Sequence, residues 1–108
     1  MYEGRCIQIQ TTFPNREEAK ELIDGMLKVS LIACGQMGDI SSIYDFEGKR
    51  CEDNEILVTL KTREALYDEC ETFIKKHHSY KVPQVIALKI TDGEKDYMKW
   101  IETSTKNY

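Results

Sequence analysis

Histidine is scarce in this chain, because only His77 and His78 occur among its 108 residues, side by side in the stretch HHSYKVPQVIALKI. Neither lies at a standard zinc-binding spacing from cysteine or from a second histidine. Neighbours on a helix end also point about 100° apart around the axis, so they do not face one ion together. A conventional zinc site is therefore excluded. The pair either finishes a helix, or one member serves a functional site.

Helical spacing separates the two histidines. His77 shares one side of a predicted helix with Leu66, Cys70, Phe73 and Ile74. We therefore expect its ring to lean on the core. His78 lies one step around the axis, at the helix end, where a cation suits the helix dipole. We predict that His78, rather than His77, belongs to any functional cleft.

The sequence also has no excess of basic residues and no long apolar run, and we expect no secretory leader. Fifteen Lys and Arg stand against nineteen Asp and Glu, for a net charge of -4, and a nucleic-acid-binding protein favours a basic face. The longest apolar stretches are far shorter than the ~20 residues of a membrane span. MYEGRCIQIQ has no basic segment followed by an apolar one. We expect a cytoplasmic protein with no nucleic-acid or membrane partner.

The four cysteines are widely spread and form no C-x-x-C pair: Cys6, Cys34, Cys51 and Cys70. In a reducing compartment we expect free thiols. Cys34 opens a strand in LIACG, so we predict that it is buried as a small hydrophobe, the alternative being a soft-metal ligand, for example for copper. The acidic stretch CEDNE beside Cys51 is either a solvated turn or a site for a hard cation.

Motifs of common catalytic sites are missing. The sequence contains no G-x-G-x-x-G, P-loop, H-E-x-x-H or G-x-S-x-G. It also shows no evident pair of nucleophile and base. We therefore expect a protein that is not an enzyme.

Hydrophobic periodicity predicts six elements and a short final helix in one domain, residues 1–108. In order they are a strand in RCIQIQTTF, a helix after the N-cap Asn15 with Glu18 completing a capping-box-like start, a hairpin with its tip near Gly48, a helix in TREALYDECETFIKKHH, a strand in QVIALKI and a helix in DGEKDYMKWIETS. The near-continuous apolar character of QVIALKI predicts a strand covered on at least one face. Tyr97, Trp100 and Ile101 are expected to form the apolar stripe of the final helix and to lie in the core. This α+β order, β-α-β-β-α-β with an additional C-terminal helix and a long central hairpin, is the ferredoxin-like pattern.

The hairpin between about Gly35 and Thr62 is longer than its helices need. A strand residue advances about 3.3 Å and a helical residue about 1.5 Å, so two ~16-residue helices cover only part of its arms. Part of the ribbon should project beyond the core. Because exposed ribbon edges aggregate unless they pair, we predict that the chain self-associates.

Four stretches resemble the CutA family of divalent-cation tolerance proteins: LIACGQ, SSIYDFEGKRCEDNEILVTLKT, HSYKVPQVIAL and DYMKWI. The family's L-A-A-C-V-N corresponds to residues 31–36 and its H-P-Y-E-V-P to residues 78–83. Its closing Y-x-x-W corresponds to Tyr97 and Trp100. The resemblance spans nearly the whole chain.

The resemblance implies a ferredoxin-like homotrimer that acts in tolerance of copper and other divalent ions. Residues of the family's intersubunit cleft carry over to Cys34, Tyr44, Glu55, Lys61, His78, Tyr80 and Trp100. We predict the metal ligands to be Cys34, His78 and Glu55, with copper or another divalent cation as the bound ion. We predict the other ligand-binding residues to be Tyr44, Lys61, Tyr80, Lys81 and Trp100.

Three departures from the family pattern fall in the same cleft. Phe46 replaces tryptophan, Ser79 replaces proline and Lys81 replaces glutamate. An ammonium near a divalent ion repels it, so we expect weaker metal binding than in relatives with the full H-P-Y-E pattern. The alternative is a trimer like the PII signalling proteins that senses an anionic small molecule, since Lys61, Lys81 and Tyr80 favour an anion.

Overall fold

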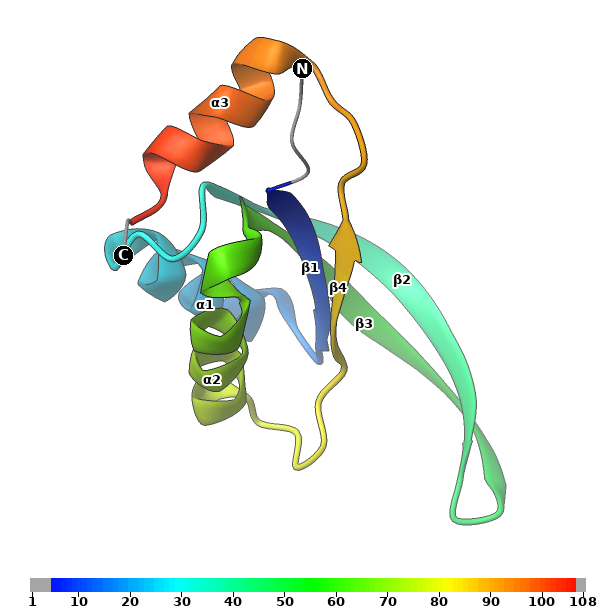
Figure 1. Ribbon diagram of the computed structural model, residues 1–108. Helices are drawn as coiled ribbons and strands as arrows, with labels where there is room; N and C mark the ends of the chain where they lie inside the picture. The colour runs from blue at the N-terminus through cyan, green and yellow to red at the C-terminus, as the bar shows by residue number, and fades with distance from the viewer. Residues whose placement is uncertain (1–4, 107–108) are drawn as a thin grey trace.

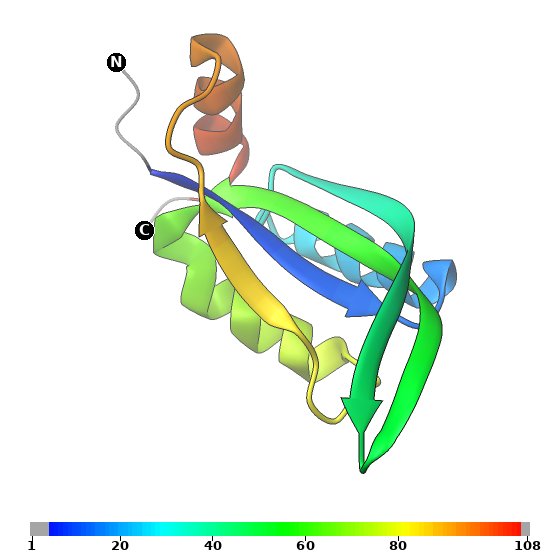
Figure 2. The same cartoon turned by 90° about the vertical axis from the view of Figure 1, so that its right-hand side faces the viewer.

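The computed structural model describes residues 5–106. Its elements follow the predicted order (Figure 1): β1 (Cys6–Phe13), α1 (Arg16–Lys28), β2 (Cys34–Phe46), β3 (Lys49–Arg63), a 3-10 turn (Glu64–Leu66), α2 (Tyr67–His77), β4 (Val85–Lys89) and α3 (Lys95–Ser104). The strands form one antiparallel sheet in the order β2-β3-β1-β4. Helices α1 and α2 lie on one face of this sheet (Figure 2). The ferredoxin-like prediction is confirmed.

The core lies between the sheet and the α1 and α2 layer. Alternate side chains of a strand point to opposite faces, and in β1 Ile7 and Ile9 are buried on the helix side. Leu22 and Met26 of α1 meet them at helical spacing. The opposite face carries Gln8, Lys61 and Leu88, which stand side by side across β1, β3 and β4.

Helix α1 begins as predicted but without a reciprocal capping box. The Asn15 side chain accepts a hydrogen bond from the Glu18 amide at 2.8 Å, so the N-cap prediction is confirmed. The Glu18 carboxylate instead accepts from the backbone amide and the hydroxyl of Ser79, at 3.0 and 2.9 Å. The second half of the capping box is therefore replaced by a tie to the segment that follows α2.

The hairpin turns at Glu47 and Gly48, which both have positive φ (52° and 78°), as the prediction of a tip near Gly48 requires. Strand β3 pairs with β1 along residues 56–63 only. Its residues 49–55 therefore pair with β2 alone. The ribbon projects well beyond the other two strands (Figure 1), and the molecule measures 47 × 26 × 21 Å. The projecting ribbon inferred from strand length is confirmed.

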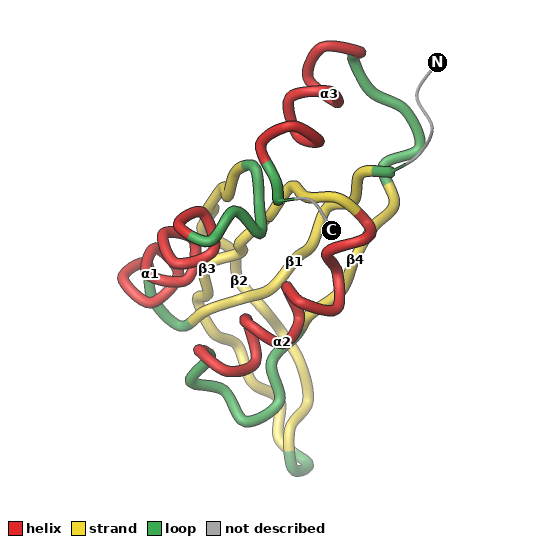
Figure 3. The backbone as a smooth tube through the Cα atoms, turned by 60° about the vertical axis from the view of Figure 1, so that its left-hand side comes forward, coloured by secondary structure: helices red, strands yellow, loops and turns green. Residues whose placement is uncertain are grey.

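Helix α3 builds a second, smaller core at one end of the fold, apart from the α1 and α2 layer (Figure 3). Met98 and Ile101 pack there against Cys6 and Ala33. The prediction that Tyr97 and Trp100 are core residues is wrong, because both are exposed, at 39% and 44%. Ile101, the third residue of the predicted stripe, is buried, and Met98 is buried beside it.

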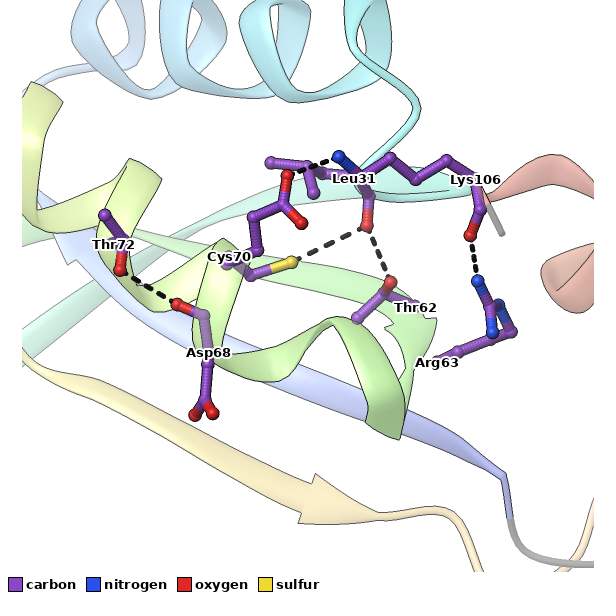
Figure 4. Close-up of polar contacts among 8 residues, drawn as sticks. Leu31, Thr62, Arg63, Asp68, Cys70, Thr72 and Lys106 are labelled. Carbon is purple, nitrogen blue, oxygen red and sulfur yellow. Dashed lines mark hydrogen bonds and ion pairs between the residues drawn. The ribbon is translucent and has the colours of Figure 1, made fainter. Parts of the chain in front are cut away.

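Polar contacts tie the end of the chain to the rest of the fold (Figure 4). The Leu31 carbonyl accepts from the Thr62 hydroxyl at 2.6 Å and from the Cys70 thiol at 3.5 Å. Arg63 donates to the Lys106 carbonyl, and its Nε donates to the Thr105 hydroxyl at 2.9 Å. The two Arg63 contacts fix the segment just after α3 to the end of β3, and the two Leu31 contacts join the segment after α1 to β3 and α2.

The prediction that β4 is covered on at least one face is wrong for a single chain. Only Val85 is half-buried, and Ile86–Lys89 are exposed. As an outer strand β4 pairs only with β1. Among residues 5–106, no helix combines the length and the apolar character that crossing a membrane requires.

Candidate functional site

The predicted site residues fall into two clusters within one chain. The Cys34 cluster joins the start of β2 to α3 and consists of Cys34, Gln36, Lys61, Tyr97 and Trp100. The Glu55 cluster joins the hairpin to the segment after α2 and consists of Tyr44, Asp53, Glu55, His78 and Tyr80. Lys81 belongs to neither, because it is exposed and has no hydrogen bond or ion pair with another residue of the described range.

Tyrosine hydroxyls face carboxylates in the Glu55 cluster. Tyr80 donates to Glu55 Oε2 at 2.8 Å, and Tyr44 donates to Asp53. Burial, reinforced by the bond to Glu55, raises the pKa of Tyr80. The hydrogen bond to Asp53 raises the pKa of Tyr44 to about 12. Both phenols therefore stay protonated at neutral pH and act as donors.

His78 is held from several sides. Its Nε2 lies 2.7 Å from the Thr12 carbonyl oxygen, and its Nδ1 lies 3.0 Å from the Tyr80 backbone nitrogen. A carbonyl only accepts and an amide only donates, so Nε2 carries the proton and Nδ1 accepts. The half-buried ring stacks on Phe13, with centroids 4.2 Å apart. In this arrangement neither ring nitrogen has a free lone pair for a metal.

His77 is exposed, so the prediction that it leans on the core is wrong. Ile74 is the last buried residue of α2, and the helix ends at His77 itself. The His77 ring stacks on the half-buried Phe73 ring at 4.3 Å, and its Nδ1 lies 2.9 Å from the Phe73 carbonyl oxygen. Its contacts are thus local to the last helical turn.

Cys34 is half-buried, not buried as predicted. It lies on the sheet face that α1 and α2 leave uncovered, and only α3 reaches over it. The Cys34 thiol is 3.8 Å from the Tyr97 hydroxyl. Burial raises the pKa of the Tyr97 phenol, and the contact with Cys34 adds to this. All four cysteines are free, as predicted.

Lys61 stands directly opposite Cys34 across the hairpin. Its Nζ donates to Gln36 Oε1 at 3.0 Å and lies 5.8 Å from the centroid of the Tyr97 ring. The Tyr97 and Trp100 rings are stacked, with centroids 5.6 Å apart and planes inclined by 28°. Sequence analysis missed Gln36, because its role depends on the cross-strand register.

A single chain does not bring the three predicted metal ligands together. Cys34 pairs with Lys61, whereas Glu55 pairs with Ile40, six positions further along β2, which is roughly 20 Å at strand rise. Residues 5–106 hold no group of three or more His, Cys, Asp or Glu side chains placed to bind one ion. The metal-site prediction therefore needs more than one chain.

A shallow hollow adjoins Glu55 where β1 ends and the β3 edge becomes free. Pro14, Asp39, Ser41, Asn54 and Glu55 contribute to its lining. Arg16 pairs with Asp39 at its rim, 3.3 Å apart. Its lining combines the carboxylates Asp39 and Glu55 with the apolar side chains Ile40 and Ile56, whereas lysine is the charged side chain of the Cys34 cluster.

Residues 7–104 match the sequence profile described as CutA1 divalent ion tolerance protein. The chain belongs to the CutA1 family. It is 41% identical to the divalent-cation tolerance protein CutA of Pyrococcus horikoshii, over 93% of this chain and 98% of that protein. The crystal structure of Pyrococcus horikoshii CutA1 superimposes with a TM-score of 0.90, covering 94% of this chain and 99% of that one at 40% identity.

Relatives in the CutA1 family are named for different compartments. The chloroplastic CutA of Arabidopsis thaliana is 39% identical over 94% of this chain, which spans 56% of that protein. The CutA of Archaeoglobus fulgidus, a solved structure named as a periplasmic divalent cation tolerance protein, matches with a TM-score of 0.91 at 31% identity, covering 94% of this chain and 99% of that one. Members of the family are thus named for more than one compartment, and the cytoplasmic location of this chain stays a prediction.

Proposed function

We propose that this chain acts in divalent-cation tolerance as a homotrimer that binds copper or a related ion between subunits. The observation that carries this proposal is the separation of the ligands. Cys34 lies at the open end of the long hairpin and Glu55 about halfway along it, roughly 20 Å away at strand rise, so one ion reaches both only when a second chain brings its Glu55 to the first chain's Cys34.

Three features support self-association. Apart from α3 beside the start of β2, no helix of the described chain covers the sheet face opposite α1 and α2 (Figure 2). On its outer strand, Ile86 and Leu88 are each 45% exposed, and burying such side chains stabilises an interface by about 1 to 2 kcal/mol each. Residues 49–55 of β3 also offer an unpaired strand edge to a partner.

The proposed ligands suit copper unequally. The Cys34 thiol is a soft donor that favours copper, and it is free. Glu55 uses Oε2 for Tyr80, and we assign its other oxygen to the metal. His78 joins them only if its Nδ1 releases the Tyr80 amide, so we propose Cys34 and Glu55 as the principal ligands. With its Nδ1 engaged by the Tyr80 amide, His78 leaves two principal ligands in place of the predicted three.

Native mass spectrometry with added copper tests this proposal. The parent should appear as a trimer with saturable copper binding, and Cys34→Ser and Glu55→Gln should each remain trimeric and lose that binding. Cys51→Ser is the matched control, because Cys51 is a half-buried thiol on the outer half of the hairpin and contacts the Lys49 carbonyl. A monomeric parent, or copper binding by both Cys34→Ser and Glu55→Gln as in the parent, would contradict the proposal.

A second candidate function is the sensing of an anionic small molecule at the same interface. Lys61 favours it, since this ammonium has only a neutral amide and a ring as partners among residues 5–106. Isothermal titration with small anions and, separately, with copper distinguishes the two functions. We propose no catalytic role, because neither histidine contacts a serine or cysteine side chain in the described part of the chain.

A further inference from the structure

Lys61 is a half-buried cation without a carboxylate partner. It forms no ion pair with any residue between 5 and 106. An ammonium has three donors, and the Gln36 oxygen takes one of them. A partly desolvated ammonium without a nearby carboxylate attracts an anion more strongly than a fully hydrated one does.

Gln36 supplies a second donor at the same place. Because Lys61 donates to Oε1, the amide oxygen is turned toward the ammonium, and the NH2 group of the same amide lies next to that oxygen. That NH2 group donates to no other residue of the described range. An ammonium and an amide side by side match the two oxygens of one carboxylate.

The aromatic pair provides an apolar surface next to these donors. Tyr97 lies under the Lys61 ammonium and Trp100 stacks on Tyr97. Both rings remain exposed by more than a third, although buried apolar residues surround the other side of α3. A flat group can therefore lie on the rings while its charge meets Lys61.

We propose that the Cys34 cluster binds a flat organic monocarboxylate, with its carboxylate on Lys61 and Gln36 and its ring on Tyr97 and Trp100. One cation selects a single negative charge over a polyphosphate, which would need further cations. This inference rests on the second candidate function and names its ligand class. It requires no metal.

Trp100 is the only tryptophan of the chain, so its fluorescence reports on this cluster directly. Benzoate serves as the probe. Benzamide has the same ring without the negative charge, and acetate has the carboxylate without the ring, so the two show whether binding requires each part. Benzoate should change the Trp100 emission saturably, and benzamide and acetate should each require at least about tenfold higher concentration. Equal effects of benzoate and benzamide would overturn the proposal.

Lys61→Met keeps the apolar stem and removes the charge, and it should weaken benzoate binding at least about tenfold. Lys89→Met is the matched control, because Lys89 is an exposed sheet lysine that pairs with Glu64 at 3.6 Å, and it should bind benzoate as the parent does. Unchanged binding by Lys61→Met, or no saturable binding by the parent, would overturn the assignment.

Native mass spectra of the same two variants separate this inference from the proposals on which it depends. If Lys61→Met loses the trimer and the parent does not bind benzoate, Lys61 pairs with a carboxylate of a neighbouring subunit and the ligand proposal is wrong. If the parent binds another anion at Lys61 but not benzoate, the second candidate function stands and only the ligand class fails.

Discussion

The His78 ring is tied to the Thr12 carbonyl by its Nε2, 2.7 Å away, across 66 residues of sequence. Its Nδ1 holds the Tyr80 amide, and Tyr80 in turn reaches Glu55. One imidazole thus fixes the segment after α2 to the end of β1. His78 can coordinate a metal ion only if one of its ring nitrogens gives up its hydrogen bond.

Removing this ring should destabilise the fold. His78→Ala loses two hydrogen bonds and the stacking on Phe13, which should lower the free energy of unfolding by about 2 to 4 kcal/mol. His77→Ala, at an exposed position, should change it by less than about 1 kcal/mol. Urea unfolding at one protein concentration measures both, and equal losses would refute the separation of the two histidines.

The end of α1 should become more stable when Ser30 is replaced by glycine. Ser30 has φ of 60°, and the amides of Ser30 and Leu31 donate to Leu27 and Met26 in a Schellman motif. Ser30→Gly should therefore raise the melting temperature, corresponding to about 0.5 to 1 kcal/mol. Ser41→Gly, in the interior of strand β2, should lower it. A lower melting temperature for Ser30→Gly would contradict the described turn.

Thr11 and Thr62 should respond oppositely to valine. Both are fully buried, but the Thr11 hydroxyl has no hydrogen-bond partner among the described residues, whereas the Thr62 hydroxyl donates to Leu31. Thr11→Val should raise the free energy of unfolding by about 1 kcal/mol, and Thr62→Val should lower it by about 1 to 2 kcal/mol. Denaturant titrations compare the two, and the same sign for both would count against the assigned contacts.

Gly35 should tolerate a side chain only if Ile23 is made smaller. A Cβ at Gly35 would lie 2.8 Å from two carbons of the Ile23 side chain. Gly35→Ala should cost about 1 to 3 kcal/mol, and Ile23→Val in the same chain should recover part of that loss. A double-mutant cycle measures this coupling. Strictly additive effects would place the two residues apart.

Periodicity was sufficient to predict β1, α1 and the hairpin, because each buries one face against the same core. It was only partly right for α3, because Ile101 of the predicted stripe is buried but Met98 joins it in place of Tyr97 and Trp100. Which stripe is buried depends on how the preceding loop sets the helix against Cys6 and Ala33. For β4, an apolar strand was correctly predicted, but its cover is not supplied by its own chain.

The candidate site could be predicted as a set of residues but not as an arrangement. Cys34 and Glu55 both lie in the motifs of the hairpin, and their separation follows only from the pairing register of β2 with β3. The partners of His78 also come from long-range contacts, one of them a backbone carbonyl that no side-chain pattern reveals. Lys61 was identified, but its pairing with Gln36 follows from the sheet.

Mixing two inactive variants tests the shared metal site most directly. Cys34→Ser and Glu55→Gln are unfolded together and refolded as a mixture, and copper binding is measured on the resulting trimers. If each site takes Cys34 from one chain and Glu55 from its neighbour, random 1:1 assembly should restore about a quarter of the parental sites. Variants refolded separately should bind none. No binding by the mixed trimers, with full binding by the parent treated alike, would show that the ion is not held between subunits by this pair.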